Sequence, residues 1–436
     1  MADTNNHNNN QSLNPFEKLL RSLSKIEPSE IKSVSASFVL ALLLMASYYL
    51  LRPVRDAMSS EWTDAELSTL WTINFVFSFV VIAAYSFFAS RTSLKKLVPG
   101  VYLFFAATFL FFYVGAKSLT DHTLIDKGFY IWVSVFSLFQ ISVFWSFMAN
   151  IFSREQSKRL FGVITSGASI GAMIGPSIAL LFSGVGTYNL MLIACALLLI
   201  TFPLIQMLNQ RPVNDSSDNL INKQSLTDTI GGGSLSGFKQ FLTNPFLLAI
   251  GAFLFLYTGI SSFIYFELKN LMTELSREQR TEIWAFMDLA TNTLTILAGF
   301  FITSRLATRF GIGVTLALLP FIVVLGMISI VLVPLLSVVV GLQIFRRGGN
   351  YAITRPAREM LFTYVDQETR FKAKQVIDVV VYRGGDVFWA WGFTFLTTGL
   401  GLGIAAIAGI GAFIAAIWTG LGLYLGRKTE QLDIQN

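Results

Sequence analysis

The chain has 436 residues, of which 53% are hydrophobic and 13% charged, and its formal net charge is +6. Soluble domains carry about 25% charged residues, so this composition excludes an ordinary soluble enzyme and a disordered chain. A mean hydropathy of +0.60 predicts a helical protein with many membrane spans.

The first 32 residues predict a cytoplasmic tail. Residues 1–13 are polar and rich in asparagine, without the apolar core of a signal peptide. From Pro15 onward, apolar residues recur at helical spacing, which indicates a short amphipathic segment on the membrane surface.

Twelve apolar stretches follow, each long enough for a helix that crosses the membrane. A polar segment over 209–244, rich in Gly and Ser, has the composition of a flexible linker and divides them into six and six. We therefore predict one six-helix bundle over 33–208, a second over 245–426 and a cytoplasmic tail over 427–436. The expected helices lie at 33–58, 69–90, 97–117, 128–152, 160–183, 187–208, 245–269, 282–305, 311–333, 335–363, 374–399 and 402–426.

Lysines and arginines are distributed unevenly over the predicted loops. The segments on the side of the termini hold 20 of them, and the loops on the opposite side hold 5. Because cytoplasmic loops are enriched in Lys and Arg, both termini are predicted to lie in the cytoplasm, with the protein in a cell (inner or plasma) membrane. Two halves of six helices around a central loop resemble the plan of the major facilitator superfamily, whose halves are related by a pseudo-twofold axis.

Seven arginines and six acids fall inside the predicted spans. An arginine facing lipid at mid-depth would cost about 2.5–3.5 kcal/mol on insertion scales, so we expect these side chains to face protein or a water-filled cavity. Guanidinium groups match phosphate and carboxylate oxygens, although ion pairs that merely hold helices together are the competing interpretation. The residues are Arg52, Arg55, Arg346, Arg347, Arg355, Arg358 and Arg383, with Asp56, Glu267, Asp288, Glu359, Asp378 and Asp386.

The first and tenth spans carry nearly the same motif, Arg-Pro-x-Arg followed by an acid. Both copies are expected to line a central cavity. Four-residue spacing on one helix face predicts one ion pair in each motif, Arg52–Asp56 and Arg355–Glu359. Arg55 and Arg358 are then left without a local partner, and we expect them to bind an anion.

Arg52 and Arg355 are also candidates for substrate binding, together with further residues of the spans. Arg346, Arg347 and Arg383 are expected to surround the anion, and Tyr382 could stack on a base or a sugar ring. The glycine pairs that follow Arg347 and Arg383 predict either a broken helix or close helix packing, and the sequence leaves both open. Glycines four residues apart in the fifth span, from Gly167 onward, favour a packing face.

Embedded acids could carry protons in coupled transport. Asp288, Asp378 and Asp386 are the candidates, while Asp56 and Glu359 are expected in ion pairs. The alternative for Asp378 and Asp386 is an ion pair with Arg346 or Arg347. This structural role is favoured for Asp386, which also lies near Arg383, and for Asp288 both roles stay open.

The single cysteine and two histidines exclude a disulfide framework and a Cys/His metal cluster. No nucleophile motif and no phosphate-binding glycine loop with lysine supports an enzyme, and we expect neither a cofactor nor nucleic-acid binding. The expected partners are the lipid bilayer, a small anionic substrate and, in the coupled case, protons. We expect a monomer.

The stretch from Pro356 to Asp386 resembles the signature of the ATP/ADP translocase family of plastids and intracellular bacteria, a branch of the major facilitator superfamily. The resemblance rests on Pro-Ala-Arg-Glu-Met at 356–360 and Asp-Gln-Glu-Thr-Arg-Phe-Lys-Ala-Lys-Gln-Val-Ile-Asp-Val-Val-Val-Tyr-Arg-Gly-Gly-Asp at 366–386. Looser matches are Tyr49-Leu-Leu-Arg-Pro-Val-Arg-Asp and Val143-Phe-Trp-Ser-Phe-Met-Ala-Asn, so the resemblance extends over the chain.

This resemblance implies a nucleotide exchanger in which embedded basic residues hold the phosphates. Arg55 and Arg358 match two of these positions, where the family's exchangers usually have lysine. The family also carries a glutamate ahead of its Phe-Trp motif, whereas residues 128–143 contain no acid here. Its second glutamate, in the seventh span, falls near Glu267 but aligns closer to Tyr265. These departures are compatible with another anionic substrate.

We therefore predict a twelve-helix secondary transporter that works by alternating access and carries an anionic, phosphorylated metabolite, with ATP and ADP as first candidates. The alternative is a proton-coupled major facilitator exporter or importer of another small organic solute. A receptor or scaffold would leave the seven embedded arginines without a function.

Overall fold

The computed structural model describes residues 26–89, 91–210, 236–301, 303–365, 373–374 and 376–435, and every regular element in these ranges is helical. The predicted amphipathic segment of the N-terminal tail and most of the predicted 209–244 linker lie outside the described residues. The bounds predicted for the tails, the two bundles and the linker therefore stay predictions.

Six long helices form the first half of the chain, which we call the N-half. Their apolar runs make helices the favoured structure in a membrane, because a helix satisfies its backbone polar groups internally. They are α2 (Ile31–Met58), α3 (Asp64–Ala89), α4 (Leu94–Ser118), α5 (Thr123–Ile151), α6 (Arg154–Leu181) and α7 (Asn189–Asn209).

The second half, which we call the C-half, begins with the short helix α9 (Ser236–Thr243). Asn244 then caps the next helix, accepting hydrogen bonds from the backbone N–H groups of Phe246 and Leu247. The membrane helices are α10 (Pro245–Leu271), α11 (Arg277–Phe301), α12 (Thr303–Leu332), α13 (Leu336–Gly349), α14 (Arg355–Leu361), α16 (Tyr382–Thr394) and α17 (Ile404–Gln435).

The tenth and eleventh predicted spans are not regular α-helices. The tenth runs from α13 through the π-helical turn η3 (Asn350–Thr354) into α14, and the eleventh includes the π-helical turns η5 (Val376–Val381) and η6 (Phe395–Gly399). Such turns often occur at functional sites. Here they adjoin embedded arginines, because Arg355 directly follows η3 and Arg383 lies in the first turn of α16.

Nine helices within the described ranges are long and apolar enough to cross a membrane. The predicted eighth, tenth and eleventh spans are not among them; α11 begins with a polar, charged run, and π-helical turns interrupt the other two. In α12, Gly311 has a φ of 78°, a conformation that favours glycine, and it breaks the helix where the ninth span is predicted to start.

Helix α6 packs along α2 through its row of glycines. A side chain at these positions would overlap backbone carbonyl oxygens of α2; the facing pairs are Gly167 with Phe38, Gly171 with Leu42 and Gly175 with Ala46. Small residues allow membrane helices to approach closely enough for extensive van der Waals contact. The predicted packing face is confirmed, and it fixes the position of the helix that carries Arg52 and Arg55.

The glycine pairs beside the arginines also serve mainly in packing. A Cβ would collide with a neighbouring side chain at Gly348, Gly349 and Gly385, whereas it would meet open space at Gly384. Helix α16 continues through its glycine pair, but the turn η3 begins directly after Gly349. Close packing therefore accounts for three of the four glycines, and an irregular helix adjoins one pair.

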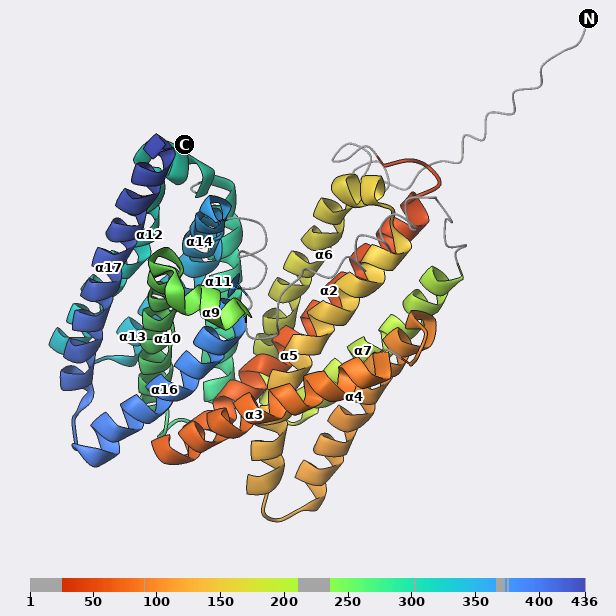
Figure 1. The fold of residues 1–436 in the computed structure, drawn as a ribbon. Helices are drawn as coiled ribbons and strands as arrows, with labels where there is room; N and C mark the ends of the chain where they lie inside the picture. Colours follow the sequence, from red (N-terminus) through yellow and green to blue (C-terminus); the bar gives the residue numbers. More distant parts are fainter. Residues whose placement is uncertain are drawn as a thin grey trace, which may run out of the picture.

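The two halves diverge toward the end of the molecule where α2 begins and α17 ends, and they converge at the opposite end (Figure 1). We call the convergent end the closed end. The main contacts between the halves join α11 with α2 and α6, and α16 with α3. These three contacts frame the space in which the embedded arginines of α2 and α16 meet.

Replacing Gly171 by alanine is expected to lower the melting temperature of the detergent-solubilised protein, because the added methyl group overlaps the carbonyl oxygen of Leu42. Overpacking of this kind costs about 1–3 kcal/mol. The control Gly162→Ala changes the same helix where nothing lies within 4 Å of the added Cβ, so its melting temperature should not fall. Equal melting temperatures for both variants would contradict a tight α2–α6 contact.

Candidate functional site

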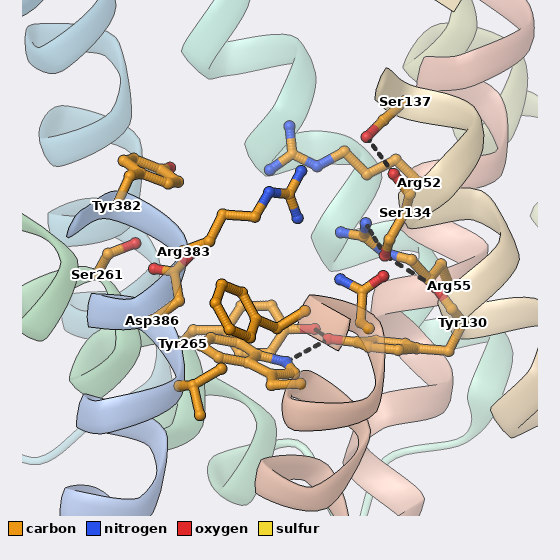
Figure 2. Close-up of a pocket in the computed structure, with 14 residues that line it drawn as sticks. Arg52, Arg55, Tyr130, Ser134, Ser137, Ser261, Tyr265, Tyr382, Arg383 and Asp386 are labelled. Atoms are coloured by element: carbon orange, nitrogen blue, oxygen red, sulfur yellow. Dashed lines mark hydrogen bonds between the residues drawn. The ribbon is translucent and has the colours of Figure 1, made fainter. Parts of the chain in front are cut away.

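A cavity of about 230 Å³ lies between the two halves. Helices α2, α3 and α5 line it from the N-half, and α10 and α16 line it from the C-half (Figure 2). The lining residues are Arg52, Arg55, Trp71, Asn74, Phe75, Tyr130, Ser134, Ser137, Ser261, Tyr265, Tyr382, Arg383, Asp386 and Val387.

Three of the seven embedded arginines line this cavity. Arg52 and Arg55 reach it from α2, and Arg383 reaches it from α16. In Figure 2 the guanidinium groups of Arg52 and Arg383 point toward each other from opposite halves. Two cations aimed into one space repel each other, and an anion bound between them would replace that repulsion with attraction.

Arg55 is held in place by a carboxylate and a hydroxyl group. Its Nε and Nη2 donate to Oδ1 of Asp56 at 2.9 and 2.6 Å, and its Nη1 donates to Oγ of Ser134 at 3.2 Å. Its guanidinium carbon also lies 5.4 Å from the ring centre of Tyr130. The prediction that Arg55 lacks a local partner is wrong, because the next residue in the chain supplies the carboxylate.

Arg52 shares two carboxylates and is close to neither. Its Nε lies 3.6 Å from Oδ2 of Asp56, which is the predicted pair, and its Nη1 lies 3.6 Å from Oδ1 of Asp288 in α11. Asp288 makes its shorter contact, 2.6 Å, with Nη2 of Arg347. Neither acid is dedicated to Arg52, so its guanidinium keeps donors for a ligand in the cavity.

Arg383 has no ion pair or hydrogen bond with any residue that the structure describes. Asp386, one turn further along α16, also lines the cavity, and within the described ranges it too lacks such a partner. The structural role favoured for Asp386 is therefore not seen, because it forms no ion pair with Arg346, Arg347 or Arg383 in the described ranges. Both charges remain available to a ligand, as does the neighbouring Tyr382.

The other four embedded arginines come from the tenth span and are not among the residues that line this cavity. Arg346 donates twice to Oε1 of Gln343, at 3.0 and 2.8 Å, and Arg347 is paired with an acid as described above. Arg355 is exposed. The expectation that Arg346 and Arg347 surround the same anion as Arg55 finds no support in this arrangement.

Arg358 is held by acids outside the cavity lining. Its Nη2 lies 3.1 Å from Oδ1 of Asp378 and 3.4 Å from Oε1 of Glu359. Glu359 also pairs with Lys374, and the predicted pair between Arg355 and Glu359 does not form. Arg358 is thus not left unpaired, and only the first copy of the repeated motif reaches the cavity.

An aromatic wall that was not predicted from the sequence connects the two halves. Tyr265 of α10 donates to Oδ1 of Asp56 at 3.1 Å, and its hydroxyl oxygen lies 3.2 Å from that of Tyr130 in α5. Trp71 of α3 donates to the same Tyr130 hydroxyl at 2.8 Å. Only their position near the ends of three spans links these residues in the sequence. These hydrogen bonds form the boundary of the cavity on the side of the closed end.

Charged side chains join the halves at the closed end. Arg277 of α11 pairs with Asp126 of α5 at 2.9 Å and with Glu61, which follows α2. Lys269 of α10 lies 2.9 Å from Asp64 at the start of α3. Each pair joins an acid of the N-half to a base of the C-half. Together they hold the two halves together on this side of the cavity.

Comparisons with known proteins agree with this architecture. A family model described as Major Facilitator Superfamily matches residues 37–363. The fold is similar to that of a bacterial homolog of the human lysosomal transporter Spinster, in an inward-facing and unoccupied conformation, with 12% identity and a TM-score of 0.58 over 93% of this chain and 99% of that chain. It is also similar to a D-xylose-proton symporter, with 12% identity and a TM-score of 0.61 over 91% of this chain and 96% of that chain.

A search of curated protein sequences found no match. The family match and the two structural likenesses confirm the predicted fold class, an all-α membrane protein with two bundles of six helices. They do not extend to the more specific resemblance to ATP/ADP translocases, which stays a prediction.

Replacing Arg277 by glutamine is expected to loosen the closed end, because it leaves Asp126 without its base and leaves Glu61 with only the longer contact of 3.4 Å to Arg280. Spin labels at Leu119→Cys and Leu400→Cys, both in exposed loops on opposite halves, would report the separation there. The native Cys195 is buried and should stay unlabelled. We expect Arg277→Gln to add a population with a longer distance.

The matched control is Arg309→Gln, which removes an exposed arginine near the other end of the molecule. Its distance distribution should equal that of the double-labelled parent. Identical distributions in the Arg277→Gln and Arg309→Gln variants would contradict a role for the ion pairs in closure.

Proposed function

The chain belongs to the Major Facilitator Superfamily and is a multi-pass membrane transporter of a small solute, and we propose that this solute is an anion carried by alternating access. The observation that supports the proposal is the meeting of three arginines in one cavity between the halves. Arg383 carries most weight, because it has no ion pair among the described residues. Phosphorylated metabolites are the proposed class, since the guanidinium fork matches phosphate oxygens.

The charge balance of the cavity favours an anion. Its lining contains three guanidinium groups but only one carboxylate, that of Asp386. Asp56, which lies behind the lining, compensates one further positive charge through Arg55. A net positive charge remains in a space bounded by apolar helices, where electrostatic attraction is less screened than in water.

Nucleotides are the first compounds to test because of the motif at 356–386. Aromatic side chains in the lining, such as Trp71 and Phe75, offer ring faces to a base. The cavity of about 230 Å³ is smaller than the roughly 300–1,000 Å³ of common ligand pockets. Small phosphorylated metabolites therefore belong in the same screen.

Alternating access gives the closed end its function. With both termini in the cytoplasm, as the loop charges predict, the closed end faces outward and the structure is an inward-facing form. The pairs of Arg277 and Lys269 then have to break when the halves rock around the cavity. An anion held between Arg52 and Arg383 would draw the halves together on the cytoplasmic side.

A proton-coupled transporter of another small solute is the second candidate. The observation that favours it is Glu267 of α10, which is 4% exposed and whose Oε1 has no hydrogen-bond partner in the described ranges. Embedded acids often carry protons in coupled transporters. A D-xylose-proton symporter shares this fold, although the likeness concerns the fold alone.

Arg383→Gln is expected to reduce uptake of labelled phosphorylated metabolites into proteoliposomes by about tenfold or more, because a hydrogen bond to a charged group is worth roughly 1.5–3 kcal/mol. Arg358→Gln should have a smaller effect, since Arg358 is held by Asp378 outside the cavity lining. Arg427→Gln, on an exposed position of α17, is the control. Undiminished uptake by Arg383→Gln would contradict the proposed anion site.

An imposed pH gradient separates the two candidate functions. For an anion exchanger, we expect uptake to depend on substrate inside the vesicle, with little effect of the gradient or of Glu267→Gln. The exposed Glu274→Gln is the matched control. Uptake that requires an inward proton gradient and is lost in Glu267→Gln, but not in Glu274→Gln, would favour the proton-coupled transporter instead.

A further inference from the structure

Asp386 places a carboxylate in the wall of the cavity that faces the arginines of α2. Its side chain is half-buried, lines the cavity and has no ion pair or hydrogen bond within the described part of the chain. In Figure 2 it lies beside Ser261 of α10, whereas the guanidinium group of Arg383 extends away from it toward Arg52. The acid therefore makes no direct ion pair with the neighbouring arginine.

The cavity is consequently divided by charge. Arg52 and Arg55 approach from α2, and the head of Arg383 extends toward them from the other side. Asp386 and the hydroxyl groups of Ser261 and Tyr382 occupy the wall formed by α10 and α16. The two sides of the cavity thus differ in charge and in hydrogen-bonding groups. They would orient a ligand whose two ends differ in the same way.

An ionised carboxylate can only accept hydrogen bonds, and its free energy rises when donors are removed from it. A ligand that enters the cavity displaces water from this wall, so the ligand itself has to supply the donors that water provided. A simple anion cannot do so, and it would also experience repulsion from the carboxylate.

We propose that the substrate is bipolar, with an anionic group bound by Arg52, Arg55 and Arg383 and a hydrogen-bond donor, an amine or a hydroxyl group, bound by Asp386. This inference rests on the proposed anion transport and narrows its substrate class. Sites built to bind a donor reject analogues that lack it, because the site's own polar group is then left unpaired. Asp386 therefore determines specificity against simple anions.

Three small phosphates test the proposal in binding titrations with the detergent-solubilised full chain. Methyl phosphate has no additional donor, O-phosphoethanolamine adds an ammonium group, and glycerol 3-phosphate adds two neighbouring hydroxyl groups. We expect the wild-type protein to bind at least one of the latter two about tenfold or more tightly than methyl phosphate. The tighter of the two identifies the kind of donor.

Asp386→Asn is expected to move the affinities in opposite directions. It should weaken binding of the donor-bearing phosphate and strengthen binding of methyl phosphate, because a negative charge near the anion is removed. The matched control is Asp378→Asn, the same substitution in the same span, whose carboxylate contacts Arg358 and not the cavity. It should keep the wild-type preference.

Equal affinities of the wild-type protein for all three phosphates would overturn the bipolar substrate and leave the anion proposal standing. A folded, monodisperse protein that binds none of them would overturn both. Loss of the preference in Asp378→Asn as well as in Asp386→Asn would overturn the assignment to Asp386, because a general structural effect would then explain it.

Discussion

An arginine inside a membrane requires carboxylates, water or a ligand, because hydrocarbon offers its guanidinium group no hydrogen bonds. The centre of this molecule is organised by that requirement. Arg55 and Arg347 are satisfied by acids at 2.6 Å, those of Asp56 and Asp288. Arg383 faces the cavity without such an acid in the described ranges. Among the arginines that line the cavity, Arg383 is thus the one for which a transported anion would supply the missing counter-charge.

Hydropathy predicted the helices because the membrane, rather than local propensity, selects them. The first was expected at 33–58 and is Ile31–Met58. The last was expected to end at 426 but continues to Gln435, because a helix need not end where its apolar run ends. Helix α3 likewise begins at Asp64, five residues before the predicted start, since polar residues can form its first turn. The π-helical turns left no comparable signal, because they depend on packing between helices.

The candidate site was less predictable than the helices. Four-residue spacing correctly paired Arg52 with Asp56, but it considers only one helix face and therefore missed the pair of Arg358 with Asp378 from another span. Which arginines reach the cavity depends on how each helix is rotated, and the sequence does not fix that rotation. For α2, this rotation is set by the glycines of α6, which allow only one close approach of the two helices. The repeated Arg-Pro-x-Arg motif accordingly has two different environments, one in the cavity lining and one outside it.

The glycine contact between α2 and α6 has a mechanical consequence. Close backbone contact gives these two helices extensive van der Waals packing, so we expect them to move together. Helix α6 also contacts the C-half, where Asn292 of α11 donates to the carbonyl oxygen of Ala172 in α6 at 2.7 Å. A displacement of Arg52 would then reach α11 by two routes, directly through Asp288 and through the hydrogen bond between α6 and Asn292.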